Sequence, residues 1–143
     1  MPHMLLIHEP VGQRATRSDA EGRAVYDRML RWGDELKERG LLLGAESLSS
    51  LDHAVRVSTA GGRARIVDGP FAEAKELIAG FSVIEANSLE EVIDMVKDWP
   101  RTDGHGNVQI EIRQIATAGD LGFNDEQQDR YNRLVEQEAA QQQ

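Results

Sequence analysis

The 143-residue chain contains no cysteine. This absence excludes disulfide bonds, a thiol nucleophile and a metal site built from thiolates. It is also typical of proteins that work in a reducing compartment, so we expect this one in the cytoplasm.

Long apolar runs and basic charge are also scarce. No apolar stretch approaches the roughly 18–20 residues that a membrane-spanning helix requires, and the first nine residues lack the pattern of a signal peptide. There are 25 acidic residues against 16 Lys and Arg, which gives a net charge of −9. Because nucleic acid is bound through clustered Lys and Arg, we expect neither a nucleic acid nor a membrane as partner.

Several motifs that hold cofactors or nucleophiles are missing as well. The sequence has no H-E-x-x-H, no G-x-S-x-G, no G-x-G-x-x-G and no P-loop. We therefore predict no metal, no nucleotide and no other cofactor. What remains is a chain long enough for one domain, with an ordinary hydrophobic content of 40%.

The acidic excess is concentrated near the C-terminus. Residues 120–143 carry six acidic and two basic side chains, which is nearly half of the net charge. We therefore divide the chain into a domain over residues 1–118 and an acidic helical arm over residues 119–143 whose end frays.

Asn124 and Gln127 form a capping pair for the helix of this arm. Its one apolar side is thin and consists of Tyr131, Leu134 and Val135. Such a helix is not stable alone, so it packs on something or frays. Two roles stay open, a solvated appendage and a segment that docks on a protein partner.

Apolar spacing and capping residues predict the elements of the main domain. Ser18 with Glu21 and Ser88 with Glu91 each match the S-x-x-E capping box, and Gly40 ends the first helix. The predicted elements are a strand over 4–7 buried on both faces, a helix over 18–39, an extended segment from 41, a hairpin with arms 54–59 and 63–67, a strand over 81–84, a helix from 88 that Pro100 closes, and a strand over 108–113.

Two separate amphipathic helices suit one face of a largely antiparallel sheet. This order of elements predicts an α+β fold, a ferredoxin-like sheet with two helices on one face and an inserted hairpin. The other face of the sheet needs a cover, for which a second subunit is the natural candidate, so we expect a homodimer. Trp32 and Trp99 are interpreted as core or dimer packing.

The least generic segment runs from Val67 to Glu76. Asp68-Gly69-Pro70 has the composition of a turn, with Pro70 at the first position of a following helix and Glu73 in its first turns. A purely structural strand-to-helix turn is one interpretation. The other is an aspartate that a rigid turn aims into a pocket.

The segment Asp68-Gly69-Pro70-Phe71, with Ala72-Glu73, Lys75-Glu76 and Gly80-Phe81 after it, closely resembles the signature of the YCII-related, DGPF-domain family. The strands over 4–7 and 110–113 resemble that family's first and last strands, so the resemblance covers residues 3–116. It implies a ferredoxin-like domain that pairs into a dimeric α/β barrel. It also implies a His–Asp active site and, for some members, an association with alternative sigma factors.

The sequence departs from the family pattern where His8 replaces the more usual tyrosine and where Gln114 replaces a proline. A His–Asp site requires an imidazole beside Asp68, and His8 and His53 are the two candidates. His3 points to the opposite side of the strand from His8, and His105 lies in a Gly-rich loop where we expect exposure. The candidate substrate-binding residues are Phe71, Lys75, Glu111 and Arg113.

These observations favour a protein that binds or transforms a small polar molecule near Asp68, with cofactor-independent acid–base chemistry if it is an enzyme. The alternative is a non-catalytic regulatory module that contacts a protein partner through the acidic arm. The sequence does not choose between them.

Overall fold

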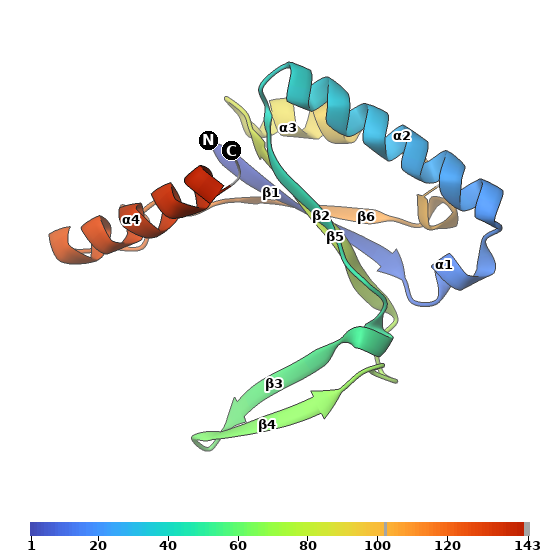
Figure 1. Ribbon diagram of the computed structural model, residues 1–143, viewed down its shortest axis with the longest axis horizontal. Helices are drawn as coiled ribbons and strands as arrows, with labels where there is room; N and C mark the ends of the chain where they lie inside the picture. The colour runs from blue at the N-terminus through green and yellow to red at the C-terminus, as the bar shows by residue number, and fades with distance from the viewer. Residues whose placement is uncertain (102, 142–143) are drawn as a thin grey trace.

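The computed structural model describes residues 1–101 and 103–141, with the side chains of the C-terminal helix described as far as Glu136 (Figure 1). Its elements in chain order are β1 (Pro2–Pro10), α1 (Gln13–Thr16), α2 (Asp19–Glu38), β2 (Leu42–Ser47), the 3₁₀ turn η1 (Leu51–His53), β3 (Val55–Ala60), β4 (Arg63–Asp68), β5 (Glu76–Glu85), α3 (Leu89–Val96), the 3₁₀ segment η2 (Asp103–Gly106), β6 (Gln109–Gln114) and α4 (Asp125–Gln141).

Four strands form an antiparallel sheet in the order β2-β5-β1-β6, so β1 and β5 are central. Strands β3 and β4 form a separate two-stranded sheet, inserted between β2 and β5. Helices α2 and α3 lie over the same face of the large sheet (Figure 1). The fold is therefore a mixed α/β arrangement with antiparallel sheets, as the element pattern predicted.

The core lies between this sheet and the two helices. Leu5 and Ile7 of β1 pack there with Trp32 and Leu36 of α2 and with residues of α3 and β5. Burial alternates strictly along β1, because the odd-numbered side chains face the helices and the even-numbered ones face away. The prediction of a short strand buried on both faces was wrong, since no helix in the described part of the chain covers the second face.

The predicted capping box is complete at α2 and half formed at α3, where Ser88 Oγ accepts from the Glu91 amide but the Glu91 carboxylate accepts from the Asn87 amide. The Ser18 side chain accepts from the Glu21 amide and the Glu21 carboxylate accepts from the Ser18 amide, which completes the capping box of α2. Gly40 follows that helix with a φ of 69°. Pro100 was wrongly expected to end the second helix, because α3 already stops at Val96.

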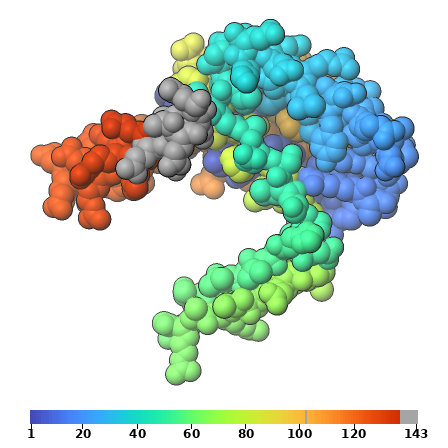
Figure 2. Space-filling view, viewed as in Figure 1, coloured from blue at the N-terminus to red at the C-terminus, as the bar shows by residue number. Residues whose placement is uncertain are grey.

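Two parts of the chain extend away from this body. Figure 2 shows the β3–β4 hairpin projecting on one side, α4 extending on the other, and a hollow between them. No helix in the described part of the chain is both long enough and apolar enough to span a bilayer.

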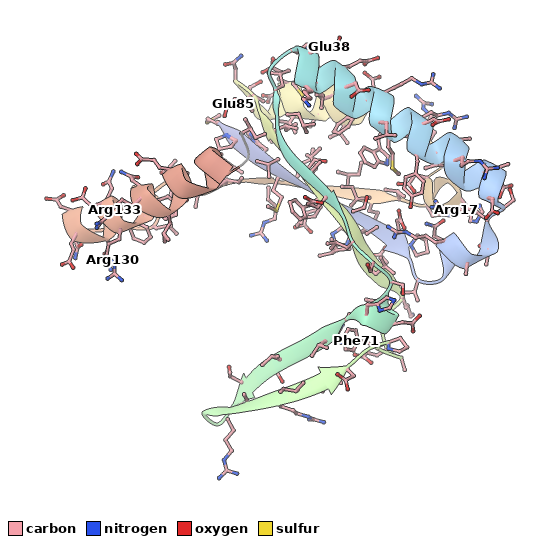
Figure 3. All side chains as sticks on the ribbon, in the orientation of Figure 1. Arg17, Glu38, Phe71, Glu85, Arg130 and Arg133 are labelled. Atoms are coloured by element: carbon pink, nitrogen blue, oxygen red, sulfur yellow. The ribbon has the colours of Figure 1, made fainter. Side chains whose placement is uncertain are left out.

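The Asp68-Gly69-Pro70-Phe71 segment joins β4 to β5 and is followed by turns, not by the predicted helix. The Gly69 amide donates to the Ala54 carbonyl at 2.7 Å, and a Cβ at Gly69 would lie only 2.1 Å from the Leu51 carbonyl oxygen. The Arg56 guanidinium lies 3.7 Å from the ring centre of Phe71, at the base of the hairpin (Figure 3). These contacts tie the segment to the hairpin, so its turn chemistry serves a strand-to-strand connection.

Candidate functional site

A cavity of about 590 Å³ lies between α2 and strands β1, β2 and β5. Its walls are largely apolar and aromatic, and include Tyr26, Met29, Trp32, Leu42 and Trp99. The two indole rings meet edge to face, with ring centres 5.1 Å apart. A concave, mostly apolar space with a few polar groups is the usual form of a small-molecule site.

Glu9 is the buried acidic group of this cavity. It follows Leu5 and Ile7 on the helix-facing side of β1 and is only 3% exposed. Its Oε2 accepts a hydrogen bond from Gln13 Nε2 at 2.8 Å and another from Arg14 Nε at 3.1 Å. The short helix α1 supplies both donors, so the chain turns back after β1 to neutralise its own buried carboxylate.

The guanidinium of Arg14 donates three hydrogen bonds to other groups of the protein. Besides Glu9, it donates from Nη1 to the Leu48 carbonyl at 2.9 Å and from Nη2 to the Ala79 carbonyl at 3.1 Å. These bonds connect α1 to β5 and to the segment after β2. Arg14 therefore positions Glu9, with three of its five N–H donors bonded to protein acceptors.

Asp103 forms a second buried carboxyl group next to Glu9. It lies in η2 and is 1% exposed, and its Oδ2 accepts from Trp99 Nε1 at 3.0 Å. The pKa of Asp103 is raised to about 6, mainly by burial and in addition by the neighbouring Glu9 carboxylate, against the lowering effect of the Trp99 hydrogen bond. Oδ1 is enclosed and has no other hydrogen-bond partner among the described residues.

The hydrogen-bonding needs of two adjacent buried carboxyl groups are met when the two share one proton. A protonated Asp103 can donate to Glu9, which removes both the repulsion of two buried charges and the missing partner of Oδ1. Asp103 therefore gains or loses its proton near pH 6, next to the Glu9 side chain that lines the cavity.

The backbone of η2 fixes Asp103 in place. Gly104 and His105 both have positive φ values, 58° and 53°, and a Cβ at Gly104 would lie 2.7 Å from Val108 Cγ2. A non-glycine residue in this region is uncommon and marks a constrained segment. His105 is exposed, as expected, and its Nε2 lies 3.1 Å from Thr16 Oγ1, which links η2 to α1.

Three of the predicted site residues meet on the open face of the sheet, away from this cavity. Glu111 Oε1 lies 3.6 Å from His8 Nε2, and Glu111 Oε2 lies 3.8 Å from Arg113 Nε. His3 is buried on the opposite face, as the spacing predicted.

The other predicted site residues lie on or near the hairpin. Asp68 is exposed and pairs with Val55 across the hairpin. His53, two positions before Val55, is exposed as well. Phe71 is buried beneath Arg56, and Lys75 is exposed. Among the described residues, neither His8 nor His53 makes a hydrogen bond or an ion pair with Asp68.

Sequence reasoning missed Glu9, Arg14 and Asp103. One signal was present for Glu9, because it continues the alternation of Leu5 and Ile7 and therefore falls on the buried face. No local pattern marks Asp103 or Arg14, since their roles depend on the packing of η2 and α1 against the end of β1.

Comparisons with known proteins cover most of the chain. A family model described as YCII-related domain matches residues 1–116. An uncharacterised protein of Rhizobium meliloti (strain 1021) is 36% identical over 85 residues, which are 59% of this chain and 68% of that protein.

Proposed function

Since the chain belongs to the YCII-related domain family, as its sequence resemblance predicted, we propose that it binds a small molecule in the cavity beside α2 and exchanges a proton with it. Glu9 and Asp103 are the proposed acid–base pair. The observation that carries this proposal is the buried Glu9, which lines an aromatic cavity and has the buried Asp103 carboxyl group beside it.

The protonation state of the pair suits acid–base chemistry at neutral pH. A general acid or base is most effective when its pKa lies near the working pH, and the pKa of Asp103 is raised to about 6. Such groups typically accelerate a reaction by about 10²–10⁴-fold. Arg14 and Trp99 hold the two carboxyl groups in place without taking part in the transfer.

The cavity favours a planar molecule that carries a hydroxyl or amino donor. Carboxyl oxygens accept hydrogen bonds, and the cation nearest to them, Arg14, already has three protein acceptors. The other charged lining residues, Asp34, Lys37 and Glu46, are exposed. An anionic group is therefore disfavoured at the inner wall, while aromatic rings are favoured against the two indoles.

The neutral fluorophore 2-naphthol tests this proposal as a probe. We expect one molecule to bind per chain, and the Glu9→Gln variant to bind it about tenfold more weakly because one charged acceptor is lost. The probe 2-methoxynaphthalene has the same rings without the donor and should bind about equally weakly to both proteins. Titration calorimetry measures all four affinities.

Two variants locate the bound probe. Ala45→Phe places a ring in the cavity and should prevent binding, whereas Ala24→Phe, on the exposed surface of α2, should leave it unchanged. Equal affinity of wild type and Ala45→Phe would show that 2-naphthol binds elsewhere and would contradict the proposal.

We also propose that the sheet is ferredoxin-like and that two copies pair through its open face, as in a dimeric α/β barrel. In support, that face carries Met4, Leu6, Phe81 and Val83, which cross-strand pairing places together. The resulting pair is a homodimer in which each subunit keeps its own cavity.

A His–Asp pair remains a second candidate for the chemistry, and one observation favours it. The Nε2 atom of His8 is enclosed and has no hydrogen-bond partner among the described residues. If Asp68 contacts it in a dimer, Asp68→Asn should change the ¹⁵N chemical shifts of the His8 imidazole, which NMR measures directly. Unchanged His8 imidazole shifts would remove this candidate and leave the Glu9–Asp103 pair unaffected.

A further inference from the structure

The β3–β4 hairpin has no core of its own. All six residues of β3 and all six of β4 are exposed, and the hairpin projects from the body (Figure 2). An isolated two-stranded hairpin is at best marginally stable in water. A surface that covers one of its faces would supply the missing stability.

The register of the hairpin gives it two different faces. Val57 pairs with Ile66, and these side chains share one face with Val55, at exposures of 64%, 69% and 56%. The opposite face carries Arg63 and Arg65, which make no ion pair among the described residues. One face is therefore apolar and the other basic, in a chain of net charge −9.

The rest of the chain offers a complement to each face. The open face of the large sheet presents the apolar side chains of Met4, Leu6, Phe81 and Val83 beside the charged Glu111 and Arg113 of β6, and neither α2 nor α3 covers it. The helix α4 lies across the hollow from the hairpin (Figure 2). One side of it carries Asp125, Asp129 and Glu136, at spacings of four and seven residues, together with Arg133, so this side is acidic on balance.

We propose that two copies exchange their hairpins, with each hairpin seated in the hollow of the other copy. The apolar face of β3–β4 covers the open sheet face, and the arginine face turns toward the acidic side of α4. This inference rests on the pairing through the open face proposed above and names the segment that does the covering.

A second copy is the favoured occupant for two reasons. Each chain carries a hairpin with an apolar and a basic face, and a hollow with an apolar and an acidic wall. The hairpin of one copy is therefore complementary to the hollow of another. The exchange is also reciprocal, because two hollows receive two hairpins and the assembly closes as a dimer. Opposite charge on the hairpin and α4 fixes which face of the hairpin points to the sheet.

The absence of cysteine allows a direct test by cross-linking. Ile66→Cys and Val83→Cys place single thiols on the hairpin and on the open sheet face, in full-length chains with tags of different size. After mixing and mild oxidation, we expect a disulfide between the two different chains. Ile66→Cys mixed with Leu89→Cys, an exposed position on α3, should give none.

Other products of this experiment distinguish the two proposals. A disulfide that joins only two Val83→Cys chains would show direct contact between open sheet faces and would overturn the hairpin exchange while leaving the pairing intact. A wild-type chain that sediments as a monomer, with no disulfide formed, would overturn both. A hairpin thiol that cross-links only to a different protein in cell extract would also overturn the exchange.

Charge exchange tests the contact with α4. We expect Arg63→Glu/Arg65→Glu and Asp125→Arg/Asp129→Arg each to raise the dimer dissociation constant by about tenfold in analytical ultracentrifugation. An equimolar mixture of the two variants should recover the loss as a mixed dimer, because both of its hairpin–arm contacts join opposite charges. No recovery, with both variants folded by circular dichroism, would contradict the contact.

Discussion

Asp103→Asn is expected to make the protein more stable at pH 8, by about 1–3 kcal/mol in the free energy of unfolding. The pKa of Asp103 is raised from 3.8 in the unfolded chain to about 6 in the folded protein. The stabilisation that protonation brings is therefore fully present below pH 4 and is lost as the pH rises through 6. An asparagine accepts the Trp99 bond and donates to Glu9 at every pH, so it keeps the protonated arrangement.

Urea denaturation from pH 4 to 8 measures this effect as the difference between wild type and variant. The difference should be small at pH 4 and grow through pH 6. Asp98→Asn, an exposed carboxylate one position before Trp99, is the control and should shift stability by less than about 0.5 kcal/mol. A variant that is less stable than wild type at pH 8 would contradict the buried carboxyl pair.

Arg14→Met is expected to destabilise the protein by about 2–4 kcal/mol. The substitution leaves Glu9 as a buried charge without its cation, and the Leu48 and Ala79 carbonyls lose their donor. Arg14→Lys keeps the charge but not the three separate donors, so it should fall between wild type and Arg14→Met. Chemical denaturation at pH 7 measures these values.

A double substitution separates the charge from the packing. Glu9→Gln removes the buried charge, so Glu9→Gln/Arg14→Met should be less destabilised than the sum of the two single variants. Arg23→Met, on the exposed side of α2, is the matched control and should change stability by less than about 0.5 kcal/mol. Additive single effects would show that Arg14 and Glu9 act independently.

The elements that local chemistry determines were predictable from the sequence. The capping box at Ser18, the glycine after α2 and the hairpin around Gly61 and Gly62 depend on residues close together in the chain, and the structure contains all three. The segment after Asp68 was predicted as a helix start because its residues suit one. Contacts with η1 and with Arg56 decide its course, and those lie outside any local window.

The candidate site also depends on contacts between distant parts of the chain, which local sequence patterns do not reveal. Glu9, Arg14 and Asp103 come from β1, α1 and η2, and the largest sequence separation among them is more than ninety residues. Only the alternation along β1 marks Glu9 as buried in advance. Nothing in Asp103-Gly104-His105-Gly106 distinguishes a buried aspartate from an exposed loop, because the pKa of Asp103 is raised first by burial and then by the distant Glu9 carboxylate, and both depend on tertiary packing.

The proton on the Glu9–Asp103 pair is the central claim, and a carboxyl ¹³C NMR titration tests it most directly. We predict that the Asp103 side-chain carbon titrates with a midpoint near pH 6, about two units above an exposed aspartate. Glu9→Gln should lower that midpoint, because it removes the neighbouring negative charge. An Asp103 carbon that titrates near pH 4 in wild type, or a midpoint that Glu9→Gln leaves unchanged, would contradict the account.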